Sequence, residues 1–480
     1  MAVEPLSPAV AAVRLPPAND ASLHDEITSR ADTVATYVRA LKVRAVGKKA
    51  LTGKGGRIAI VDGARTPFVR SFSVFKDMDV VDLAGVATAE LVAKTGIDPR
   101  EIDLAVFGVV VPALHAPNLG REVVFRASLP MTVQGTTVNL ACASSNRAIA
   151  FGAQAILSGE AEVVIAGGAE SLSNVPLTFG KHAQETFLRL SKARSLGQKL
   201  GAAGQFRPRD FAPVAPAIAE YTTGLSMGQS AEKMAKENDI SRRAQDEFAL
   251  QSHRRAAAAQ AEGRFANQIV PTFPPPAYGQ AVMADNGVRS DSSYEALAQL
   301  RPVFDRRYGT LTAGNSSPLT DGGAAVLLMS EEKAKALGYT PIAYLRSYAV
   351  AAVDPAGQLL QGPAFAAPAA LEAAGVELAE MDLVEVHEAF AAQVLSTLKA
   401  LASKKFGEEA LGRSGAVGSV DLERVNVNGG SISIGHPFGA TGARIVMQLA
   451  QELGRRQQNL GLVTVCAAGG HGFAMVLERD

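Results

Sequence analysis

The stretch GIDPREIDLAVFG at residues 96–108 recurs as GVELAEMDLVEVH at residues 375–387, and this repeat decides the fold. Glycine, glutamate, aspartate and leucine stand at the same four places in both copies. Further along each half, the helix-like residues 144–159 and 441–454 each lead into an apolar strand pattern and a Gly-Gly pair. Chance can produce one such match, but two matches in the same order indicate a duplicated unit.

Strand-like and helix-like patterns alternate in both halves of the chain. RIAIV at residues 57–61 has the composition of a strand, and residues 81–94 have helical spacing that ends before Gly96. Such alternation predicts an α/β fold with a largely buried sheet. Residues 174–310 break the pattern with a Pro-rich stretch, an amphipathic helix pattern at residues 241–263 and few strand signals, which indicates an inserted loop domain.

We therefore expect four segments. They are an N-terminal extension, partly disordered, at residues 1–55; a first α/β half at residues 56–177, completed by residues 305–338; the loop domain at residues 178–304; and a second α/β half at residues 339–480. Residues 27–41 of the extension have helical spacing. A surface helix docked on its own fold explains that spacing best, and a helix that binds a partner or a membrane surface is the alternative.

Composition limits the partners and the compartment. The chain has 480 residues, and its 47 Lys and Arg balance its 47 Asp and Glu, so bulk attraction to nucleic acid or to an anionic membrane is not expected. No apolar run approaches the roughly 20 residues of a membrane helix, and the N-terminus lacks the pattern of a secretory signal. The two cysteines lie far apart, which fits free thiols in a reducing cytoplasmic setting.

Three residues have the chemistry and the setting of a reactive site. Cys142 lies in NLACASSNRAIA, where a strand pattern gives way to a helix start; His436 stands in Gly-His-Pro; Cys466 follows the apolar GLVTV. A helix start favours a thiolate, so we expect the pKa of Cys142 to fall from about 8.5 into the range of roughly 3.5–7.5. His436 could take the thiol proton, and Cys466 could exchange a proton with carbon. Each residue alone could be structural, but the three together favour thiol-based acyl chemistry.

The sequence resembles the thiolase family, the acetyl-CoA acyltransferases and acetyltransferases. The resemblance runs from about Arg57 to the C-terminus and rests on ordered stretches: NLACASSNRAIA, VVIAGGAESLS, LTAGNSSPLTDGGAA, HEAFAAQ, NVNGGSISIGHPFGATGAR and CAAGGHG. It is most similar to the thiolase (beta) chain of the trifunctional β-oxidation complex. The resemblance implies two duplicated α/β halves in a five-layered αβαβα arrangement, with an inserted loop domain that binds coenzyme A.

The resemblance also implies roles for single residues. Cys142 matches the nucleophile that carries the acyl group, His436 the histidine that activates it, and Cys466 the acid/base that exchanges the α-proton. One oxyanion hole would use His436 and a water held by His387, and the other the backbone N–H groups of Cys142 and Ala468. The residues implied to contact coenzyme A or the acyl chain are Arg289, Ser317, Met227, Ala389 and Phe390.

Three residues depart from the common pattern of the family. His387 replaces an asparagine, so the contact to the water would depend on the tautomer of an imidazole. Ser226 replaces a histidine that often precedes Met-Gly, which puts short-chain specificity in doubt. Ala468 replaces a glycine, so we expect a negative φ there. All three departures fit the degradative branch of the family.

We therefore expect an acyltransferase, a 3-ketoacyl-CoA thiolase of fatty acid β-oxidation acting on chains longer than acetoacetyl. The alternatives are a short-chain acetyl-CoA C-acetyltransferase, a decarboxylating ketoacyl synthase, which would not need Cys466, and a non-catalytic thiolase-like scaffold. The resemblance implies coenzyme A as a substrate, no metal or redox cofactor, a homodimer or homotetramer, and a hydratase/dehydrogenase chain as a candidate partner.

Overall fold

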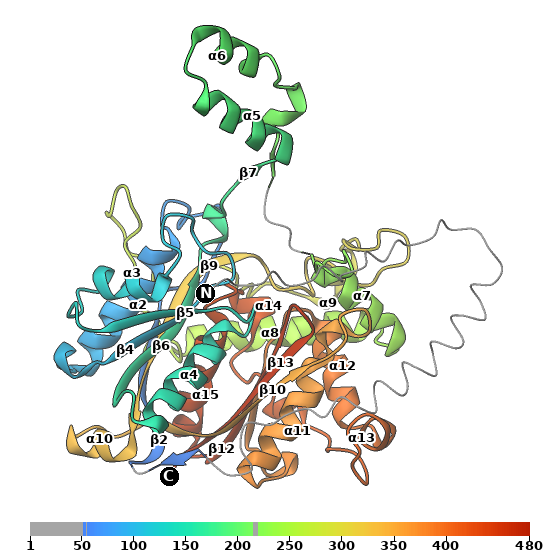
Figure 1. Cartoon of the computed structure of the whole chain (residues 1–480). Coiled ribbons are helices and arrows are strands. Elements are labelled where there is room, and N and C mark those ends of the chain that lie inside the picture. The colour runs from blue at the N-terminus through green and yellow to red at the C-terminus, as the bar shows by residue number, and fades with distance from the viewer. Residues whose placement is uncertain (1–50, 54, 215–218) are drawn as a thin grey trace, which may run out of the picture. The chain divides into compact units, whose positions relative to one another are not determined.

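The computed structural model describes residues 51–53, 55–214 and 219–480 (Figure 1). All of them belong to one compact unit, Val43–Asp480. The expectations for residues 1–50, including disorder and the helix at residues 27–41, lie outside the described residues. None of the helices within the described ranges is long and apolar enough to cross a membrane.

The first half of the chain forms one part of a large sheet. Its strands are β1 (Thr52–Gly53), β2 (Gly56–Arg65), β3 (Val69–Arg70), β4 (Leu104–Gly108), β5 (Gln134–Val138), β6 (Val163–Glu170) and β9 (Thr320–Ser330). The main order is β5-β4-β6-β9-β2, with β1 beside β2 and β3 beside β9. β4 runs parallel to β5 and β6, whereas β9 runs antiparallel to β6 and β2.

The second half repeats this order. Its strands are β10 (Ala343–Ala352), β11 (Leu383–Val386), β12 (Leu460–Ala467) and β13 (His471–Glu478), arranged β11-β12-β13-β10. β11 is parallel to β12, and β13 is antiparallel to β12 and β10. A single parallel bridge from Val425 to Val384 takes the place that β5 has beside β4. The duplication predicted from the sequence repeat is confirmed strand by strand.

Helices cover both faces of the two half-sheets and fill the space between them (Figure 1). They are α2 (Val80–Thr95) and α3 (Leu119–Arg126) on the first half, α4 (Ser144–Ser158) and α15 (Thr441–Arg456) in the middle, and α11 (Gly362–Ala374) and α12 (Ala391–Leu401) on the second half. Separate apolar clusters fill the outer first-half layer, the middle layer and the outer second-half layer. The expected αβαβα layering is confirmed, and pairing of β2 with β10 joins the half-sheets into one.

Glycines end the helices where the sequence pattern predicts. α2 ends at Gly96 and α11 at Gly375, and these are the two equivalent glycines of the repeat. Their φ values are 66° and 68°, a left-handed conformation that glycine adopts without the cost that a Cβ brings. Gly159 ends α4 in the same way, with φ 78°. The repeat therefore marks the turn between a helix and a buried strand in each half.

Between β6 and β9 the chain leaves the sheet and forms mostly helices and loops. The elements are β7 (Thr178–Phe179), α5 (Lys181–Lys192), α6 (Leu196–Ala203), β8 (Pro213–Val214), α7 (Met227–Glu237), α8 (Arg242–Ala261) and α9 (Tyr294–Ala298). The helix predicted at residues 241–263 is α8, which Ser241 caps by accepting from the Ala244 N–H group. A buried ion pair between Arg65 of β2 and Asp285 ties this region to the sheet. The short helices α10 (Glu331–Ala336), α13 (Lys404–Glu409) and α14 (Ser431–Ile434) complete the fold.

The two halves meet backbone to backbone at a pair of glycines. Gly168 lies on β6, and Gly439 lies in the loop before α15. A Cβ on Gly168 would lie 2.0 Å from the carbonyl oxygen of Gly439, and a Cβ on Gly439 would lie 2.4 Å from the carbonyl oxygen of Ala169. No side chain fits at either place. The loop that carries His436 therefore rests directly on the first half.

Alanine at Gly168 tests this contact. We expect Gly168→Ala to destabilise the protein by about 1–3 kcal/mol, because the methyl group must push a backbone carbonyl of the other half aside. With an unfolding entropy of about 2.1 cal/mol/K per residue, the apparent melting temperature should fall by roughly 1–3 °C. Gly201→Ala is the matched control, because a Cβ there has nothing within 4 Å. An equal melting temperature for Gly168→Ala and Gly201→Ala would show that the halves do not depend on this contact.

Candidate active site

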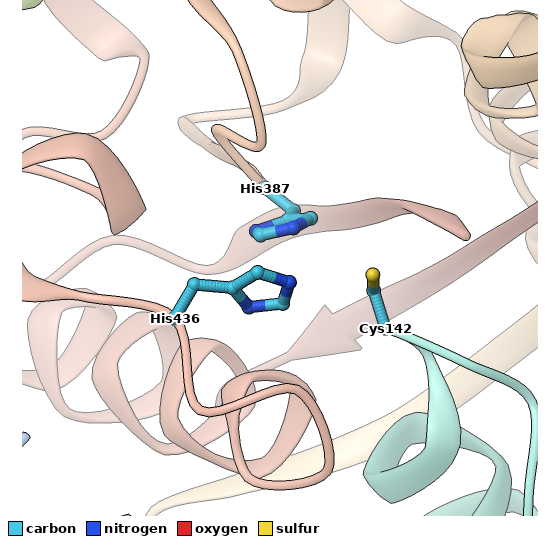
Figure 2. A group of neighbouring side chains, drawn as sticks. All are labelled: Cys142, His387 and His436. Carbon is cyan, nitrogen blue, oxygen red and sulfur yellow. The ribbon is translucent and has the colours of Figure 1, made fainter. Parts of the chain in front are cut away.

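Three loops bring their side chains together where the halves meet. Cys142 lies just before α4, His387 follows β11, and His436 lies between α14 and α15. The sulfur of Cys142 and one ring nitrogen from each histidine lie within 4.8 Å of one another. Figure 2 shows both rings beside the Cys142 side chain. The arrangement places a nucleophile next to two groups that can accept or donate protons.

A tight turn presents Cys142. Ala141 before it has φ 46°, a left-handed conformation that is uncommon for a residue with a Cβ. The turn is held by Asn139, whose side-chain oxygen accepts from the Ala141 N–H group at 3.0 Å. The Ser144 hydroxyl accepts from the Leu140 N–H group and donates to the Ala141 carbonyl. The prediction that Cys142 lies just before a helix start is confirmed, since α4 begins at Ser144.

The prediction of a lowered thiol pKa at this helix start is wrong for the resting protein. Burial raises the pKa of Cys142 to about 12, even though the backbone N–H groups of Ala468 and of Cys142 itself act to lower it. The residue keeps some solvent exposure, but its thiol group is desolvated, and desolvation disfavours the charged form more strongly than two N–H dipoles favour it. Resting Cys142 is therefore a neutral thiol. The same two N–H groups remain available to a charge that develops on a substrate oxygen.

His436 is poised to accept a proton through Nε2. The Thr441 hydroxyl donates to the Pro437 carbonyl at 2.9 Å, so it accepts from Nδ1–H of His436, which lies 2.7 Å away. Nε2 then carries a lone pair, and it has no hydrogen-bond partner among the described residues. Burial, with the charge of Arg444, lowers the pKa of His436 to about 3, which keeps the resting imidazole neutral.

Glu170 holds the His436 loop against the first half. Its carboxylate accepts from the backbone N–H groups of Val110, Val111 and Gly439 at 2.9–3.0 Å. Burial raises the pKa of Glu170 to about 7, and the three N–H donors oppose that rise. Because its partners come from both halves, Glu170 joins the loop after β4 to the loop before α15.

His387 lies against His436, with ring centroids 4.1 Å apart. Its backbone N–H donates to the Thr464 carbonyl of β12 at 2.9 Å, and its Nδ1 lies 2.9 Å from the Ser431 hydroxyl. Burial, followed by the charges of His436 and Arg444, lowers the pKa of His387 well below its ordinary value. Cysteine and two histidines also have the composition of a zinc site, so the tautomer of His387 decides what this cluster can bind.

Cys466 lies in a second cluster with the residues expected to line the acyl pocket. It is the last residue but one of β12, and it packs with Ala389, Phe390 and the partly buried Met227. Burial, followed by the charge of Cys142, raises the pKa of Cys466 well above its ordinary value. Among the described residues with a positive φ are Gly469 and Gly470 but not Ala468, as expected for alanine at that turn.

Arg289 lines a separate surface pocket of about 260 Å³, together with Arg70, His253 and Asp291. Neither arginine forms an ion pair with a carboxylate in the part of the chain that the structure describes. Burial, followed by the charges of Arg289 and Arg70, lowers the pKa of His253 to about 4. Ser317 precedes Pro318 of this pocket, and its N–H donates to the Ala389 carbonyl at 3.0 Å. Two unpaired cations make this pocket suitable for an anionic group.

Several buried residues of the site carried no recognisable signal in the sequence analysis. Glu388 accepts from Ser252, from Asn426 and from the Ile432 N–H group, and so fixes the loop that carries His387. Glu388 was visible only as the second letter of HEAF, and Glu170 only as the residue after Gly-Gly-Ala. Ser431 and Arg444 lie in NVNGGSISIGHPFGATGAR, but the sequence alone assigned neither residue a role. A buried polar residue shows its partners only after folding, so sequence spacing could not have paired these groups.

The neutral resting thiol makes a testable prediction about pH. Because the thiol pKa is raised to about 12 and the His436 pKa is lowered to about 3, the thiolate fraction should grow steadily with pH. We expect the rate of Cys142 alkylation by iodoacetamide, followed by peptide mass spectrometry, to rise through pH 6–9. A rate that is flat across this range would indicate a preformed thiolate–imidazolium pair and contradict the neutral state.

Comparisons with known proteins agree with this geometry. Residues 58–332 match the family "Thiolase, N-terminal domain", and residues 339–479 match "Thiolase, C-terminal domain". A 3-ketoacyl-CoA thiolase of Pectobacterium atrosepticum is 50% identical over 428 residues, 89% of this chain and 98% of that protein. One of Yersinia pestis is 49% identical over 430 residues, 90% of this chain and 98% of that protein.

Solved structures show the same fold. The Bacillus anthracis acetyl-CoA acetyltransferase is similar with a TM-score of 0.75 and 34% identity, covering 88% of this chain and 98% of that one. Human mitochondrial 3-ketoacyl-CoA thiolase in complex with CoA has a TM-score of 0.75 and 32% identity, and the match covers 90% of this chain and 99% of that one. With both halves of the chain matched and half of the aligned residues identical in such relatives, this protein belongs to the thiolase family.

Proposed function

We propose that this protein is a 3-ketoacyl-CoA thiolase, which uses coenzyme A to cleave a 3-ketoacyl-CoA to acetyl-CoA and a shortened acyl-CoA in fatty acid β-oxidation. The observation that carries the proposal is the meeting of Cys142, His436 and His387 within 4.8 Å at the junction of the halves. Relatives named 3-ketoacyl-CoA thiolase at 49–50% identity support the degradative reaction over short-chain acetyl-CoA C-acetyltransferase activity.

The first half of the reaction forms a thioester on Cys142. The Cys142 thiol gives its proton to Nε2 of His436 as its sulfur attacks the 3-keto carbon. The N–H groups of Cys142 and Ala468, which already act on the thiol, stabilise the negative charge on the 3-keto oxygen. The C–C bond then breaks, and the acyl group stays on Cys142.

Cys466 protonates the carbon that leaves. Breaking the C–C bond produces the enolate of acetyl-CoA, and this carbanion must take up a proton. The raised pKa of Cys466 keeps its thiol protonated at neutral pH, the state that a proton donor needs. Coenzyme A then attacks the thioester on Cys142: its thiol proton passes to the Cys466 thiolate, His436 returns its proton to the departing Cys142 sulfur, and the shortened acyl-CoA leaves. In the reverse direction the Cys466 thiolate would remove the same proton.

The pocket around Arg289 suits a phosphate group of coenzyme A. Arg289 and Arg70 face the same pocket and repel each other, since the charge of Arg289 acts with burial to lower the pKa of Arg70. An anion bound between them would relieve this repulsion. His253 accepts from the Arg289 N–H group through Nδ1. We propose that residues 178–304 act as the coenzyme A loop domain for this reason, with Ser317 next to Pro318, which lines the same pocket.

The acyl chain would run along the cluster of Met227, Ala389 and Phe390. Met227 is the first residue of α7, and Ser226 before it serves as the helix cap in a capping box with Gln229. The Ser226 side chain is held by its own helix and is smaller than the histidine that often precedes Met-Gly. We propose on this basis that the substrate chain is longer than acetoacetyl.

The proposal extends to assembly and setting. We propose a homodimer or homotetramer, a cytoplasmic location, and no metal or redox cofactor, with a hydratase/dehydrogenase chain as a candidate partner. Residues 1–55 are a candidate docking element for such a partner. These statements rest on the likeness to the degradative thiolases.

Replacing each cysteine separates the two halves of the proposed reaction. Cys142→Ala should abolish both thioester formation and cleavage. Cys466→Ala should lose cleavage and α-proton exchange by at least about 10²–10⁴-fold, the usual contribution of a general acid or base, yet it should still take an acyl group from acetyl-CoA. Mass spectrometry after incubation with acetyl-CoA measures acylation, and thiolysis of a ladder of 3-ketoacyl-CoA substrates measures cleavage. Near-normal cleavage by Cys466→Ala would overturn its role, and absence of thiolysis in the unmodified protein would overturn the function.

Removing the pocket cations should weaken coenzyme A binding without changing the chemistry. We expect Arg289→Met and Arg70→Met each to raise the KM for coenzyme A by about 10- to 100-fold, the value of a hydrogen bond to a charged group, with kcat nearly unchanged. Arg243→Met is the control, because Arg243 pairs with Glu247 on α8 and does not line the pocket. An unchanged KM in both pocket variants would place the coenzyme A phosphates elsewhere.

A further inference from the structure

The Ser431 hydroxyl lies between two buried side chains, His387 and Arg444. Its oxygen lies 2.9 Å from Nδ1 of His387 and accepts from Nη2 of Arg444 at 3.1 Å. Ser431, His387 and Arg444 are each fully buried. A buried polar atom that lacks a hydrogen-bond partner costs free energy, so the partners of these three side chains constrain where their protons sit.

Counting protons in this contact selects one tautomer of His387. Arg444 can only donate, so the Ser431 oxygen is its acceptor. The Ser431 proton then needs an acceptor of its own, and Nδ1 of His387 is the acceptor within hydrogen-bond distance among the described residues. If Nδ1 carried the proton instead, Ser431 would receive two donors and its own proton would be left without a partner. Ser431 therefore donates to Nδ1, and the His387 proton sits on Nε2.

The proton on Nε2 has no acceptor within the described residues. Nε2 of His387 is buried and lacks a hydrogen-bond partner, and the His387 ring lies beside Cys142 and His436 (Figure 2). His436 has the opposite arrangement, with its proton on Nδ1 and a bare Nε2. Two adjacent imidazoles beside Cys142 thus differ at the ring nitrogen that has no partner: Nε2 carries a lone pair in His436 and a proton in His387.

We propose that Arg444 and Ser431 are positioning residues that hold His387 as its Nε2–H tautomer, so that His387 donates a hydrogen bond into the oxyanion hole it shares with His436, where the enolate charge of the leaving acetyl-CoA develops. This inference rests on the proposed thiolase reaction and adds a fixed role for each of the three residues. A donor that is already oriented before the reaction costs no reorganisation when the charge appears. His387 donates this hydrogen bond at a position where the common asparagine of the family would donate from its side-chain amide.

The surroundings of Arg444 keep this arrangement in place. Arg444 also contacts Gln448, which donates to Glu385 of β11 at 3.0 Å. Glu385 and Glu388 are the carboxyl groups of the second half that face this cation, and burial raises the pKa of both. Burial is the largest cause of the lowered pKa of His387 and of His436, and the Arg444 charge adds to it in both. Both imidazoles therefore stay neutral, which preserves one donor and one acceptor.

The same tautomer bears on metal binding by this cluster. A histidine nitrogen must be deprotonated to ligate zinc, and Nε2, the His387 ring nitrogen that Ser431 leaves free, carries the proton. His436 and Cys142 alone leave a zinc ion with two protein ligands, fewer than the three or four of protein zinc sites. The Ser431 contact thus favours a proton donor over a metal ligand.

Nitrogen-15 NMR of the full-length protein with labelled histidine tests the tautomers directly. The chain has seven histidines, and loss of a signal in His387→Asn or His436→Asn assigns these two. We expect the His387 proton on Nε2 and the His436 proton on Nδ1. Ser431→Ala should turn the His387 signals into those of a tautomer mixture while the His436 signals stay unchanged. A proton on Nδ1 of His387 in the unmodified protein would overturn the proposal.

Kinetics supply a second readout. We expect Ser431→Ala to lower kcat for thiolysis by about 3- to 10-fold, the value of one net hydrogen bond, with the KM for substrate nearly unchanged. In a His387→Asn background the same change should have little effect, because an amide does not depend on Ser431 for its N–H. An equal loss of kcat in both backgrounds would show that Ser431 acts only as a structural residue.

Ser433→Ala is the matched control. Ser433 lies on the same short helix and is also buried, but its hydroxyl contacts Ser252 and the Gly430 carbonyl and neither histidine. It should leave the His387 spectrum unchanged; a tautomer change in Ser433→Ala equal to that in Ser431→Ala would overturn the assignment of Ser431. Absence of thiolysis in the unmodified protein would instead refute the proposed function, whatever tautomers the spectra report.

Discussion

The architecture of the site depends on a backbone contact between the two halves, at Gly168 and Gly439. A methyl group on either residue would overlap a carbonyl oxygen of the opposite half. This approach lets Glu170 reach N–H groups from both sides, and it seats the His436 loop beside the turn of Cys142. In a wider junction the nucleophile and its base would not meet.

Desolvation sets the protonation states that this junction needs. Burial is the largest cause of the pKa shifts of Cys142, Cys466, His387 and His436. It raises the pKa of the two thiols and lowers the pKa of the two imidazoles, so all four groups are neutral at rest. The hydrogen bonds from Thr441 and Ser431 then decide which ring nitrogen of each histidine holds the proton. Burial therefore sets the charge of each group, and local hydrogen bonds set which ring nitrogen donates and which accepts.

The sequence predicted the fold better than it predicted the state of the site. The repeat ending at Gly108 and His387 reflects backbone requirements, a glycine turn and a buried strand, that are local and leave a readable pattern. The placement of Cys142 before a helix was equally local and is confirmed. The predicted pKa of Cys142 was wrong. The helix start is visible in the sequence, but the groups that bury the thiol come from distant segments. The partners of Ser431 and Glu388 were invisible for the same reason.

The neutral thiol of Cys142 also has a consequence for how long the protein survives. The thiolate form of cysteine attacks peroxides and disulfides, so susceptibility to oxidation follows thiolate character and access. A resting thiol with its pKa raised to about 12, and a second cysteine buried beside it, offer almost no thiolate to such reagents. The site therefore resists oxidation while empty, and its sulfur becomes reactive only as a bound substrate accepts the electrons and His436 accepts the proton.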